Sequence, residues 1–149
     1  MTDVILRSAA EPDLAEVLVL YRHLHPQDPE LDAATAERVW STLLAAPFMT
    51  LIVAQAAERL VASCTLAIVP NLSRGGRPYG VIENVVTHAD FRRLGLGRRV
   101  LAHAVDLAWR GDCYKVLLAT GSKRETTLRF YEGAGFERGG KTYFEIRRP

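Results

Sequence analysis

The chain has 149 residues, of which 48% are hydrophobic and 24% are charged, and this is the composition of an ordinary globular protein with one hydrophobic core. No apolar run approaches the roughly 20 residues of a membrane-spanning helix, and the N-terminus lacks the basic and then apolar pattern of a secretion signal. We therefore expect a single domain over residues 1–149 that is cytoplasmic and has no membrane partner.

Apolar residues that recur at helical or alternating spacing predict a chain of mixed helices and strands. In chain order we expect a strand at 4–7, helices at about 11–24 and 33–45, a hairpin of strands at 48–56 and 60–69, a strand at 79–87, a helix at about 96–110, a strand at 115–120, a helix at 124–133, and a final hairpin of strands at 136–138 and 143–147. Pro26 and Pro29 prevent the first helix from continuing. The second helix should turn Val39, Leu43 and Leu44 inward.

The strand, helix and strand between residues 80 and 120 form a unit that joins two parallel strands. The other strands follow one another closely, as antiparallel neighbours do. The sequence thus predicts an α/β (α+β) fold, in which a mixed, mostly antiparallel sheet with one parallel pair is flanked by helices.

Charge is distributed unevenly along the chain. Residues 1–73 contain four Lys and Arg against nine Asp and Glu, whereas residues 74–149 contain fifteen against eight. The basic second half suits a polyanionic ligand, and the acidic first half would attract a cationic amine. The alternative is chance asymmetry on a solvated surface.

The cysteines, histidines and arginines give no sign of a disulfide, a metal or a nucleic acid. Cys64 and Cys113 lie far apart in apolar stretches, which predicts buried free thiols. The four histidines show no metal-ligand spacing. The arginines do not alternate with aromatic residues on one evident face, so no nucleic-acid partner is predicted.

A basic, glycine-containing turn separates the strand at 79–87 from the helix at 96–110. A helix that begins near Gly95 points its free N–H groups and the positive end of its dipole into this turn. Gly95 and Gly97 lack a Cβ, so the backbone can approach a phosphate closely. Four arginines add forked donors suited to phosphate oxygens: Arg92, Arg93, Arg98 and Arg99. The turn therefore predicts a ligand with a diphosphate group.

Two common diphosphate-binding patterns do not fit this turn. The nicotinamide-dinucleotide pattern needs a third glycine three residues after the second, where this chain has Val100. The nucleotide P-loop ends in Gly-Lys-Ser or Gly-Lys-Thr, whereas this chain has Gly97-Arg98-Arg99. Neither ligand is predicted.

The remaining pattern resembles the acetyl-CoA signature of the GCN5-related N-acetyltransferase (GNAT) family, and Arg92, Gly95 and Gly97 match its Arg-x-x-Gly-x-Gly form. The preceding Ile82-Glu83-Asn84-Val85-Val86-Thr87 resembles the central strand of that family. Arg129-Phe130-Tyr131-Glu132-Gly133-Ala134-Gly135-Phe136 resembles its late helix and turn. The resemblance covers residues 80–137 in detail and implies the GNAT acyl-CoA N-acyltransferase fold.

In this family acetyl-CoA lies where the central strand and the next strand separate after a bulge, and backbone groups of the central strand bind its pantetheine arm. The cofactor-binding residues that the resemblance implies are Val85, Val86, Thr87, Arg92, Arg93, Leu94, Gly95, Leu96, Gly97, Arg98, Ser122 and Arg124. A backbone N–H near Val85 would also stabilise the oxyanion of the tetrahedral intermediate.

One position departs from the family pattern. Many relatives have an Asn that binds the cofactor seven residues before the late-helix tyrosine, and an Ala three residues after that Asn. This chain has Arg124 and Thr127 there. Ser122, Lys123 or Arg124 would then replace the Asn in phosphate binding.

Two side chains are expected to carry the chemistry. Alternation places Glu83 on the same strand face as Val85, beside the thioester, where a carboxylate can deprotonate the incoming amine directly or through a water. Family members with Glu at this place use it as the general base; the alternative is a glutamate held by a neighbouring arginine. Tyr131 matches the tyrosine whose hydroxyl can protonate the departing CoA thiolate, and the alternative is a tyrosine packed in the core.

The acceptor is the least determined part of the prediction. Acceptor contacts in the family come from the loop between the first two helices, the region before the central strand and the final hairpin, which here offer Tyr21, His25, Arg74, Tyr79 and Tyr143. We expect an N-acetyltransferase that moves acetyl from acetyl-CoA to a primary amine, of a small molecule rather than a protein, by direct attack in a ternary complex. The alternatives are a non-catalytic acyl-CoA sensor, an enzyme using a longer acyl-CoA, and one acting on a protein amine. The resemblance also allows a homodimer.

Overall fold

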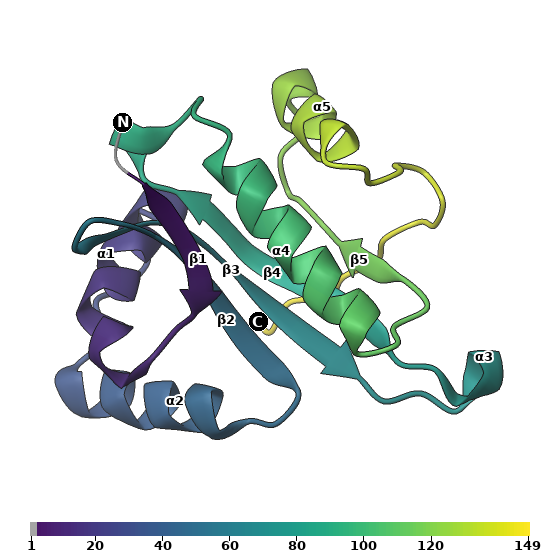
Figure 1. Cartoon of the computed structure of the whole chain (residues 1–149), viewed down its shortest axis with the longest axis horizontal. Helices are drawn as coiled ribbons and strands as arrows, with labels where there is room; N and C mark the ends of the chain where they lie inside the picture. The colour runs from purple at the N-terminus through teal and green to yellow at the C-terminus, as the bar shows by residue number, and fades with distance from the viewer. Residues whose placement is uncertain (1–2) are drawn as a thin grey trace.

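The structure, a computed structural model, describes residues 3–149 (Figure 1). Its elements are β1 (Val4–Ser8), η1 (Glu11–Asp13), α1 (Leu14–Leu24), α2 (Ala33–Ala45), β2 (Met49–Ala56), β3 (Arg59–Val69), the single turn α3 (Ser73–Gly76), β4 (Tyr79–Thr87), η2 (Ala89–Phe91), α4 (Leu96–Arg110), β5 (Val116–Leu118) and α5 (Glu125–Gly133). None of these helices is long and apolar enough to cross a membrane.

The five strands form one sheet in the order β1-β2-β3-β4-β5. All neighbours are antiparallel except β4 and β5, which pair in parallel from Gly80 and Val116 to Ile82 and Leu118. The predicted mixed sheet with one parallel pair is therefore confirmed. The crossover from β4 to β5 runs through α4, as such a connection requires.

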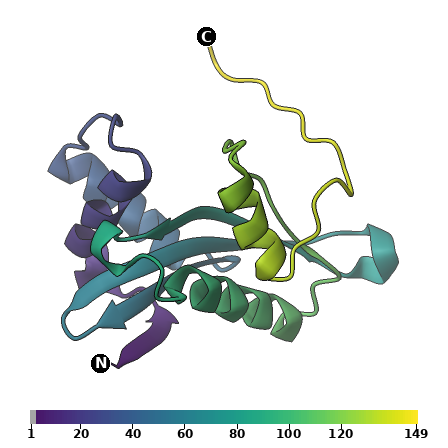
Figure 2. The same ribbon diagram turned by 90° about the horizontal axis from the view of Figure 1, so that it is seen from above.

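Helices cover the two faces of the sheet unequally (Figures 1 and 2). α4 lies along one face, where Val100, Leu101 and Ala104 are fully buried in a cluster with sheet residues that include Leu66 and Ile82. α1 and α2 pack on the other face through a second cluster, whose buried members are Val17, Leu20, Trp40, Leu51, Val53, Leu60 and Val86.

The second face is open where β4 begins and β5 lies. An added Cβ on Gly80 would meet Val116 Cγ2 at 3.3 Å and Ala108 Cβ of α4 at 3.5 Å, so these positions face α4. Their neighbours in the two strands point to the opposite side, and none of them is buried. We call this surface the open face and define it by Tyr79, Val81, Glu83, Lys115 and Leu117.

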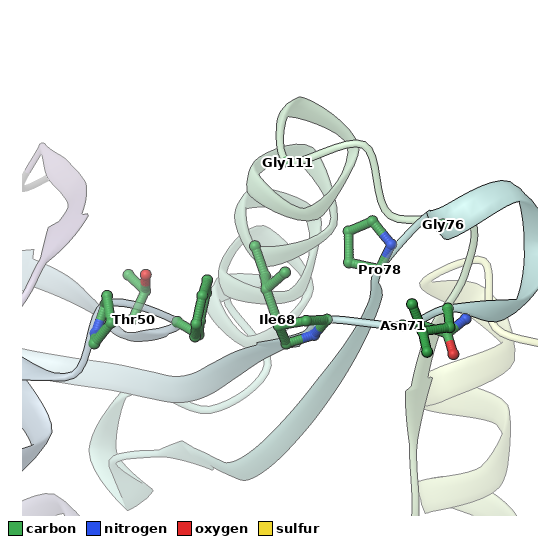
Figure 3. A pocket seen from close by; sticks show the side chains of 10 residues that line it. Thr50, Ile68, Asn71, Gly76, Pro78 and Gly111 are labelled. Carbon is green, nitrogen blue, oxygen red and sulfur yellow. The ribbon is translucent and has the colours of Figure 1, made fainter.

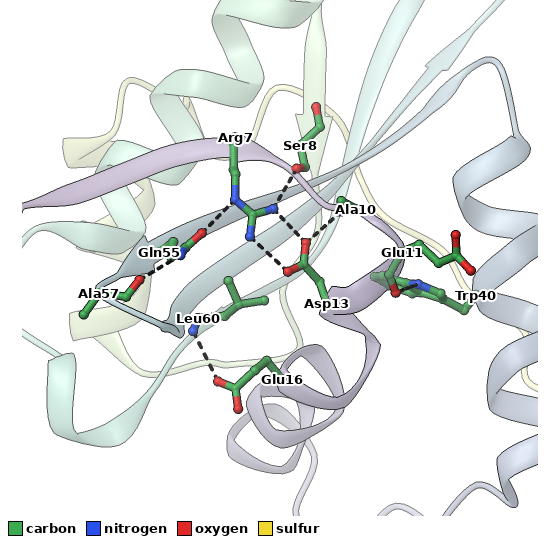
Figure 4. Close-up of polar contacts among 10 residues, drawn as sticks. All are labelled: Arg7, Ser8, Ala10, Glu11, Asp13, Glu16, Trp40, Gln55, Ala57 and Leu60. Atoms are coloured by element: carbon green, nitrogen blue, oxygen red, sulfur yellow. Dashed lines mark hydrogen bonds and ion pairs between the residues drawn. The ribbon is translucent and has the colours of Figure 1, made fainter.

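An ion-pair network ties β1 to the start of α1 (Figure 4). The Arg7 guanidinium donates to both carboxylate oxygens of Asp13, at 2.7 and 2.9 Å, and to Gln55 Oε1 of β2 at 2.8 Å. Asp13 also accepts the backbone N–H of Ala10 at 2.7 Å. Nearby, the indole N–H of Trp40 donates to the Glu11 carbonyl at 3.1 Å and links α2 to the same turn. The network fixes α1 against the sheet edge.

The predicted inner face of α2 is wrong in part. Val39 and Leu44 are 45% and 37% exposed, and the helix instead buries Ala36 and Trp40, with Leu43 packed beside them. The stripe shifts by about one residue because the indole of Trp40 has the largest apolar area to bury and a carbonyl partner within reach.

The predicted final hairpin is also wrong, since the chain forms no strand after Leu118 within residues 3–149. Arg138 bonds Glu125 and Glu132 of α5, at 2.9 and 3.0 Å, and the chain then leaves the body of the molecule (Figure 2). We call residues 139–149 the C-terminal arm. Its side chains bond only one another among the described residues, through Tyr143 and Arg147 to Glu145. Alternating apolar residues predict a strand, but the arm has no strand partner within residues 3–149.

Candidate active site

A β-bulge in β4 determines how this strand presents its groups. Ser63 of β3 pairs with Val86 and Thr65 pairs with Glu83, so Asn84 and Val85 together oppose the single residue Cys64. Asn84 has φ of 54°, a left-handed backbone that Asn tolerates better than most residues. Sequence reasoning missed the role of Asn84, although an Asn within an otherwise β-prone strand was a usable signal.

The bulge corrects one prediction about Glu83. Ile82 and Val85 both pack on the α4 side, whereas Val86 belongs to the cluster under α1. Glu83 therefore faces away from Val85 instead of sharing its face, because the extra residue at the bulge reverses the alternation. Its carboxylate lies exposed on the open face, opposite Thr65.

Beyond the bulge, β4 has a free edge. Pairing with β5 ends at Ile82 and Leu118, so the β4 residues from 83 to 87 have no strand partner on that side within residues 3–149. Apart from the Thr87 carbonyl, which accepts the Arg92 Nε–H at 3.3 Å, the backbone groups of Val85, Val86 and Thr87 on this edge are available to a ligand. Their placement follows from the separation of two strands that pair over only three residues each.

The turn after β4 has the predicted geometry of an anion site. Gly95, with φ of 75°, is the N-cap of α4, and the helix begins at Leu96 as expected. Gly97 lies so close to its surroundings that an added Cβ would be 3.0 Å from Phe130 Cζ and 3.3 Å from Thr87 Oγ1. This contact brings the first turn of α4 against both β4 and α5.

A groove of about 720 Å³ joins the free edge of β4, this turn and α5. Ten of the twelve residues predicted for the cofactor line it: Val85, Val86, Thr87, Arg92, Arg93, Gly95, Leu96, Gly97, Arg98 and Arg124. Tyr131 lines it as well. Eight further residues line the groove that the sequence did not predict, because only the folding of the chain brings them to it: His23, Leu24, Phe91, Thr126, Thr127, Arg129, Phe130 and Gly133.

Leu94 and Ser122 are absent from the lining. The Leu94 side chain is 64% exposed. Ser122 is occupied locally, since its hydroxyl bonds Thr127 Oγ1 at 3.1 Å and accepts the backbone N–H of Arg124 at 3.3 Å. These bonds shape the start of α5.

The charges of the groove suit a polyanion. Five arginines line it, and no Asp or Glu within residues 3–149 does: Arg92, Arg93, Arg98, Arg124 and Arg129. Arg98 also packs against Gly133, where an added Cβ would be 3.3 Å from its terminal nitrogen. The groove therefore fits the diphosphate ligand that the turn predicts.

Tyr131 comes from α5, packs partly in the main core cluster and reaches the groove. Burial raises the pKa of its hydroxyl, with smaller contributions from Cys64 and the Glu83 carboxylate. The phenol is therefore protonated at neutral pH.

Tyr21 of α1 points to the bulge. Burial raises the pKa of its hydroxyl, against the lowering effect of polar contacts with the side chains of Thr65 and Asn84. Thr65 Oγ1 and Ser63 Oγ are buried, and neither oxygen has a well-formed hydrogen bond within residues 3–149. Tyr21 thus meets the bulge directly beside Glu83.

The other residues predicted to contact the acceptor lie in different parts of the molecule. Arg74 and Tyr79 come together near the start of β4, in one group with Tyr114 and Lys115. His25 is the C-cap of α1, where its backbone N–H bonds the Tyr21 carbonyl. Tyr143 lies on the C-terminal arm, and a hydrogen bond to Glu145, with a smaller effect of the Glu83 charge, raises the pKa of its hydroxyl.

The two cysteines are free and buried, as predicted. Burial raises the pKa of the Cys64 thiol to about 12, so this thiol is protonated at neutral pH even though it lies beside the bulge. No cluster of three or more potential metal ligands occurs within residues 3–149.

A second hollow, of about 650 Å³, lies beside the loop between β3 and β4 (Figure 3). Its lining is Pro47, Phe48, Thr50, Ile68, Pro70, Asn71, Leu72, Gly76, Pro78 and Gly111. None of the predicted site residues lines it, and it has no titratable side chain for catalysis.

Comparisons with known proteins agree with this geometry. The sequence profile of the Acetyltransferase (GNAT) family matches residues 16–136. The chain belongs to this family. A glucosamine 6-phosphate N-acetyltransferase of Trypanosoma brucei brucei is 34% identical over 140 residues, which cover 91% of this chain and 92% of the relative.

Solved GNAT structures share the fold. An Agrobacterium tumefaciens protein assigned as an acetyltransferase is 46% identical, with a TM-score of 0.93 and coverage of 97% of this chain and 99% of that one. A Trypanosoma brucei acetyltransferase is 32% identical, with a TM-score of 0.84 and coverage of 98% and 100%. As a GNAT enzyme, the chain transfers an acetyl group from acetyl-CoA to an amine.

Proposed function

We propose that this GNAT enzyme acetylates the primary amine of a small polar molecule by direct attack of the amine on acetyl-CoA in a ternary complex. The position of Glu83 carries the proposal. Its carboxylate is exposed on the open face, at the point where the free edge of β4 begins to line the arginine-rich groove. Acetyl-CoA in the groove and an amine on the open face would meet at the bulge.

Glu83 is proposed as the general base. An amine is protonated at neutral pH and cannot attack until it loses a proton, and a solvent-exposed carboxylate can accept that proton directly or through one water. The nitrogen lone pair then forms the new bond to the acetyl carbon. A backbone N–H on the free edge of β4, near Val85, would stabilise the oxyanion.

Tyr131 is proposed as the general acid. When the carbon–sulfur bond breaks, the electron pair goes to sulfur, and the Tyr131 hydroxyl can donate its proton to that thiolate. Burial keeps this hydroxyl protonated at neutral pH. Its position on the groove supports the assignment.

Direct attack is favoured over a covalent acetyl-enzyme. The Cys64 thiol lies opposite the bulge, and its pKa is about 12 because it is buried. A thiol reacts as its thiolate, which is scarce at neutral pH with such a pKa. The amine therefore receives the acetyl group without a protein-bound intermediate.

We propose an amino sugar as the first acceptor to test. The Trypanosoma brucei brucei relative, which matches this chain over most of both lengths, is a glucosamine 6-phosphate N-acetyltransferase. The decisive experiment measures CoA release with acetyl-CoA and a panel of amino sugars, amino sugar phosphates, polyamines, amino acids and lysine peptides. We expect release with at least one small amine and loss of release in Glu83→Gln.

Other outcomes of the same panel separate the alternatives. Acetyl-CoA binding without turnover on any amine would identify an acyl-CoA sensor. Turnover of lysine peptides alone would indicate a protein substrate. Faster reaction with propionyl-CoA or succinyl-CoA would indicate a longer acyl donor, and each of these results would contradict the proposal.

We also propose that two copies associate through the C-terminal arm. The side-chain bonds of Tyr143 and Arg147 to Glu145 put these residues on one side of an extended segment and leave Phe144 and Ile146, 87% and 98% exposed, on the other. β5 ends the sheet with an unpaired edge, which such a segment can extend. Light scattering should show a dimer that Phe144→Asp converts to a monomer; a monomeric wild-type chain would contradict this proposal.

A further inference from the structure

Two cations and two tyrosines gather at the start of β4 and β5. The Lys115 ammonium lies 5.4 Å from the ring centre of Tyr79 and 5.3 Å from that of Tyr114. The Arg74 guanidinium lies 5.6 Å from the Tyr114 ring centre. The two rings meet edge to face, with centres 6.5 Å apart. We call these four residues the cation–aromatic cluster.

The cluster shares the open face with Glu83. Gly80 and Val116 face α4, so Tyr79 and Lys115, their neighbours in sequence, face the other way. Glu83 lies on that same side of β4 because the bulge begins only after it. A molecule whose amine lies at Glu83 can therefore extend along the strand to the cluster without crossing the sheet.

The positive charges of the cluster have no anionic partner among the described residues. Neither Arg74 nor Lys115 forms an ion pair within residues 3–149, and the nearby Asp112 is engaged by Arg77 at 3.1 Å. Lys115 is also only half exposed. The faces of the two tyrosines attract these cations but do not neutralise them. Two cations near one ring repel each other, and an anion between them would relieve the repulsion.

The backbone conformation at Arg74 positions the side chain of this residue. Arg74 has φ of 56°, a left-handed conformation unusual for a residue with a side chain, and Gly75 and Gly76 continue the same turn. The turn directs the guanidinium over Tyr114. Such local strain is commonly found where a side chain has a binding role.

We propose that the cation–aromatic cluster binds an anionic group, phosphate or carboxylate, of the amine acceptor. This inference rests on the proposed function, since it names the chemistry of the acceptor at the same site. Lys115 and Arg74 supply the charge, and the tyrosine rings contact the apolar part of the molecule. Glu83 follows Tyr79 by four positions along the strand, about 13 Å between Cα atoms, so the amine and the anion of the best acceptor lie on the order of 10 Å apart.

The test uses matched pairs of acceptors that differ only in charge. These are aminoalkyl phosphates of increasing length beside the amino alcohols of the same length, with glucosamine 6-phosphate beside glucosamine. The wild type should prefer the phosphate, by kcat/KM, most strongly at the length that spans the two sites. Lys115→Met, which keeps the apolar stem, should lower that preference about tenfold or more, since a charge-assisted contact is lost.

Three controls make the test specific. Lys115→Arg should retain most of the preference, and Arg77→Gln, which removes a charge from the same loop but one already paired with Asp112, should leave it within about twofold. The KM for acetyl-CoA should be unchanged in all variants, because no cluster residue lines the arginine-rich groove.

Two results would overturn the inference: a wild type that acetylates phosphate and alcohol equally well at every length, or a Lys115→Met variant that loses both activities to the same extent. Either result leaves acetyl transfer to a small amine intact. Failure of the proposed function is distinguished by the absence of CoA release with every amine, charged or neutral.

Discussion

The arginine-rich groove and the open face are built from different kinds of groups. The groove is made by the free backbone edge of β4, the glycine turn and the first turn of α4, which pack so closely that a Cβ on Gly97 would force the Phe130 ring to shift. The open face presents side chains, from Glu83 to the cation–aromatic cluster, with no helix over them. We therefore expect the groove to bind its ligand mainly through backbone groups and general positive charge, and the open face to bind its ligand through particular side chains.

This difference explains why acetyl-CoA is easier to infer than the acceptor. Backbone recognition demands a local pattern of glycines, strand and helix start, which a short stretch of sequence displays. Side-chain recognition demands residues that are distant in sequence, and almost any type can serve. Variants on the two sides should therefore affect different kinetic constants.

The largest effect is expected from Glu83→Gln. Loss of a general base lowers turnover by about 100-fold to 10,000-fold. The KM for acetyl-CoA should stay nearly constant, because Glu83 lies on the open face and outside the groove. Steady-state kinetics at neutral pH, with acetyl-CoA affinity measured by calorimetry, test this split. Full turnover in the variant would remove Glu83 as the base.

Tyr131→Phe should have the next largest effect, a fall in kcat of about tenfold to a hundredfold, since a thiolate is a tolerable leaving group even without a proton donor. The pH profile gives a second test. Because burial raises the pKa of Tyr131 above the ordinary 10.0, its proton is present throughout the neutral range and is lost only above pH 10. A tyrosine with a packing role alone would leave kcat unchanged in the Phe variant.

Gly97→Ala tests the cofactor side. The added Cβ would lie 3.0 Å from Phe130 Cζ, so the ring must shift within the wall of the groove. We expect the KM for acetyl-CoA to rise about fivefold, corresponding to about 1 kcal/mol of strain, with the acceptor KM unchanged. Gly140→Ala, on the C-terminal arm where an added Cβ meets nothing within 4 Å, is the matched control. Equal effects of both variants would contradict the close-packed groove.

The sequence predicted best those elements whose signals all lie within one short segment. The bounds of β4 and α4 were predicted to the residue, because alternation, the glycine N-cap and the apolar stripe all lie within these segments. The orientation of Glu83 was predicted wrongly, since the bulge depends on the register between β4 and β3. The cation–aromatic cluster was missed as a unit because only the parallel pairing of β4 with β5 brings Lys115 to Tyr79.

The prediction of a final hairpin was wrong for a related reason. A strand needs a partner edge as well as an alternating pattern, and the C-terminal arm has the pattern but no partner strand in the part of the chain that the structure describes. In contrast, the residues that line the groove were largely predicted, since strand, turn and helix start are consecutive. Leu94 stays a prediction, since its side chain is exposed and only its backbone could contact a ligand in the groove.

The smallest effect we predict lies far from both ligands and tests whether the two regions depend on one rigid sheet. In Asp13→Asn the loss of the paired carboxylate should lower the free energy of unfolding by about 1–3 kcal/mol at neutral pH, without changing either KM. The hydrogen bond from Arg7 holds the pKa of Asp13 below its ordinary value of 3.8. The folded state therefore binds fewer protons than the unfolded state, so this contribution is complete above the unfolded pKa and disappears as the pH falls through the folded one. Urea unfolding across this acid range should show the wild type and Asp13→Asn converging.

The control is Glu30→Gln, at an ion pair whose side chains are 72% and 87% exposed, and it should change the unfolding free energy by less than about 0.5 kcal/mol. A gap between wild type and Asp13→Asn that stays constant at low pH would show that the Asp13 charge does not stabilise the fold.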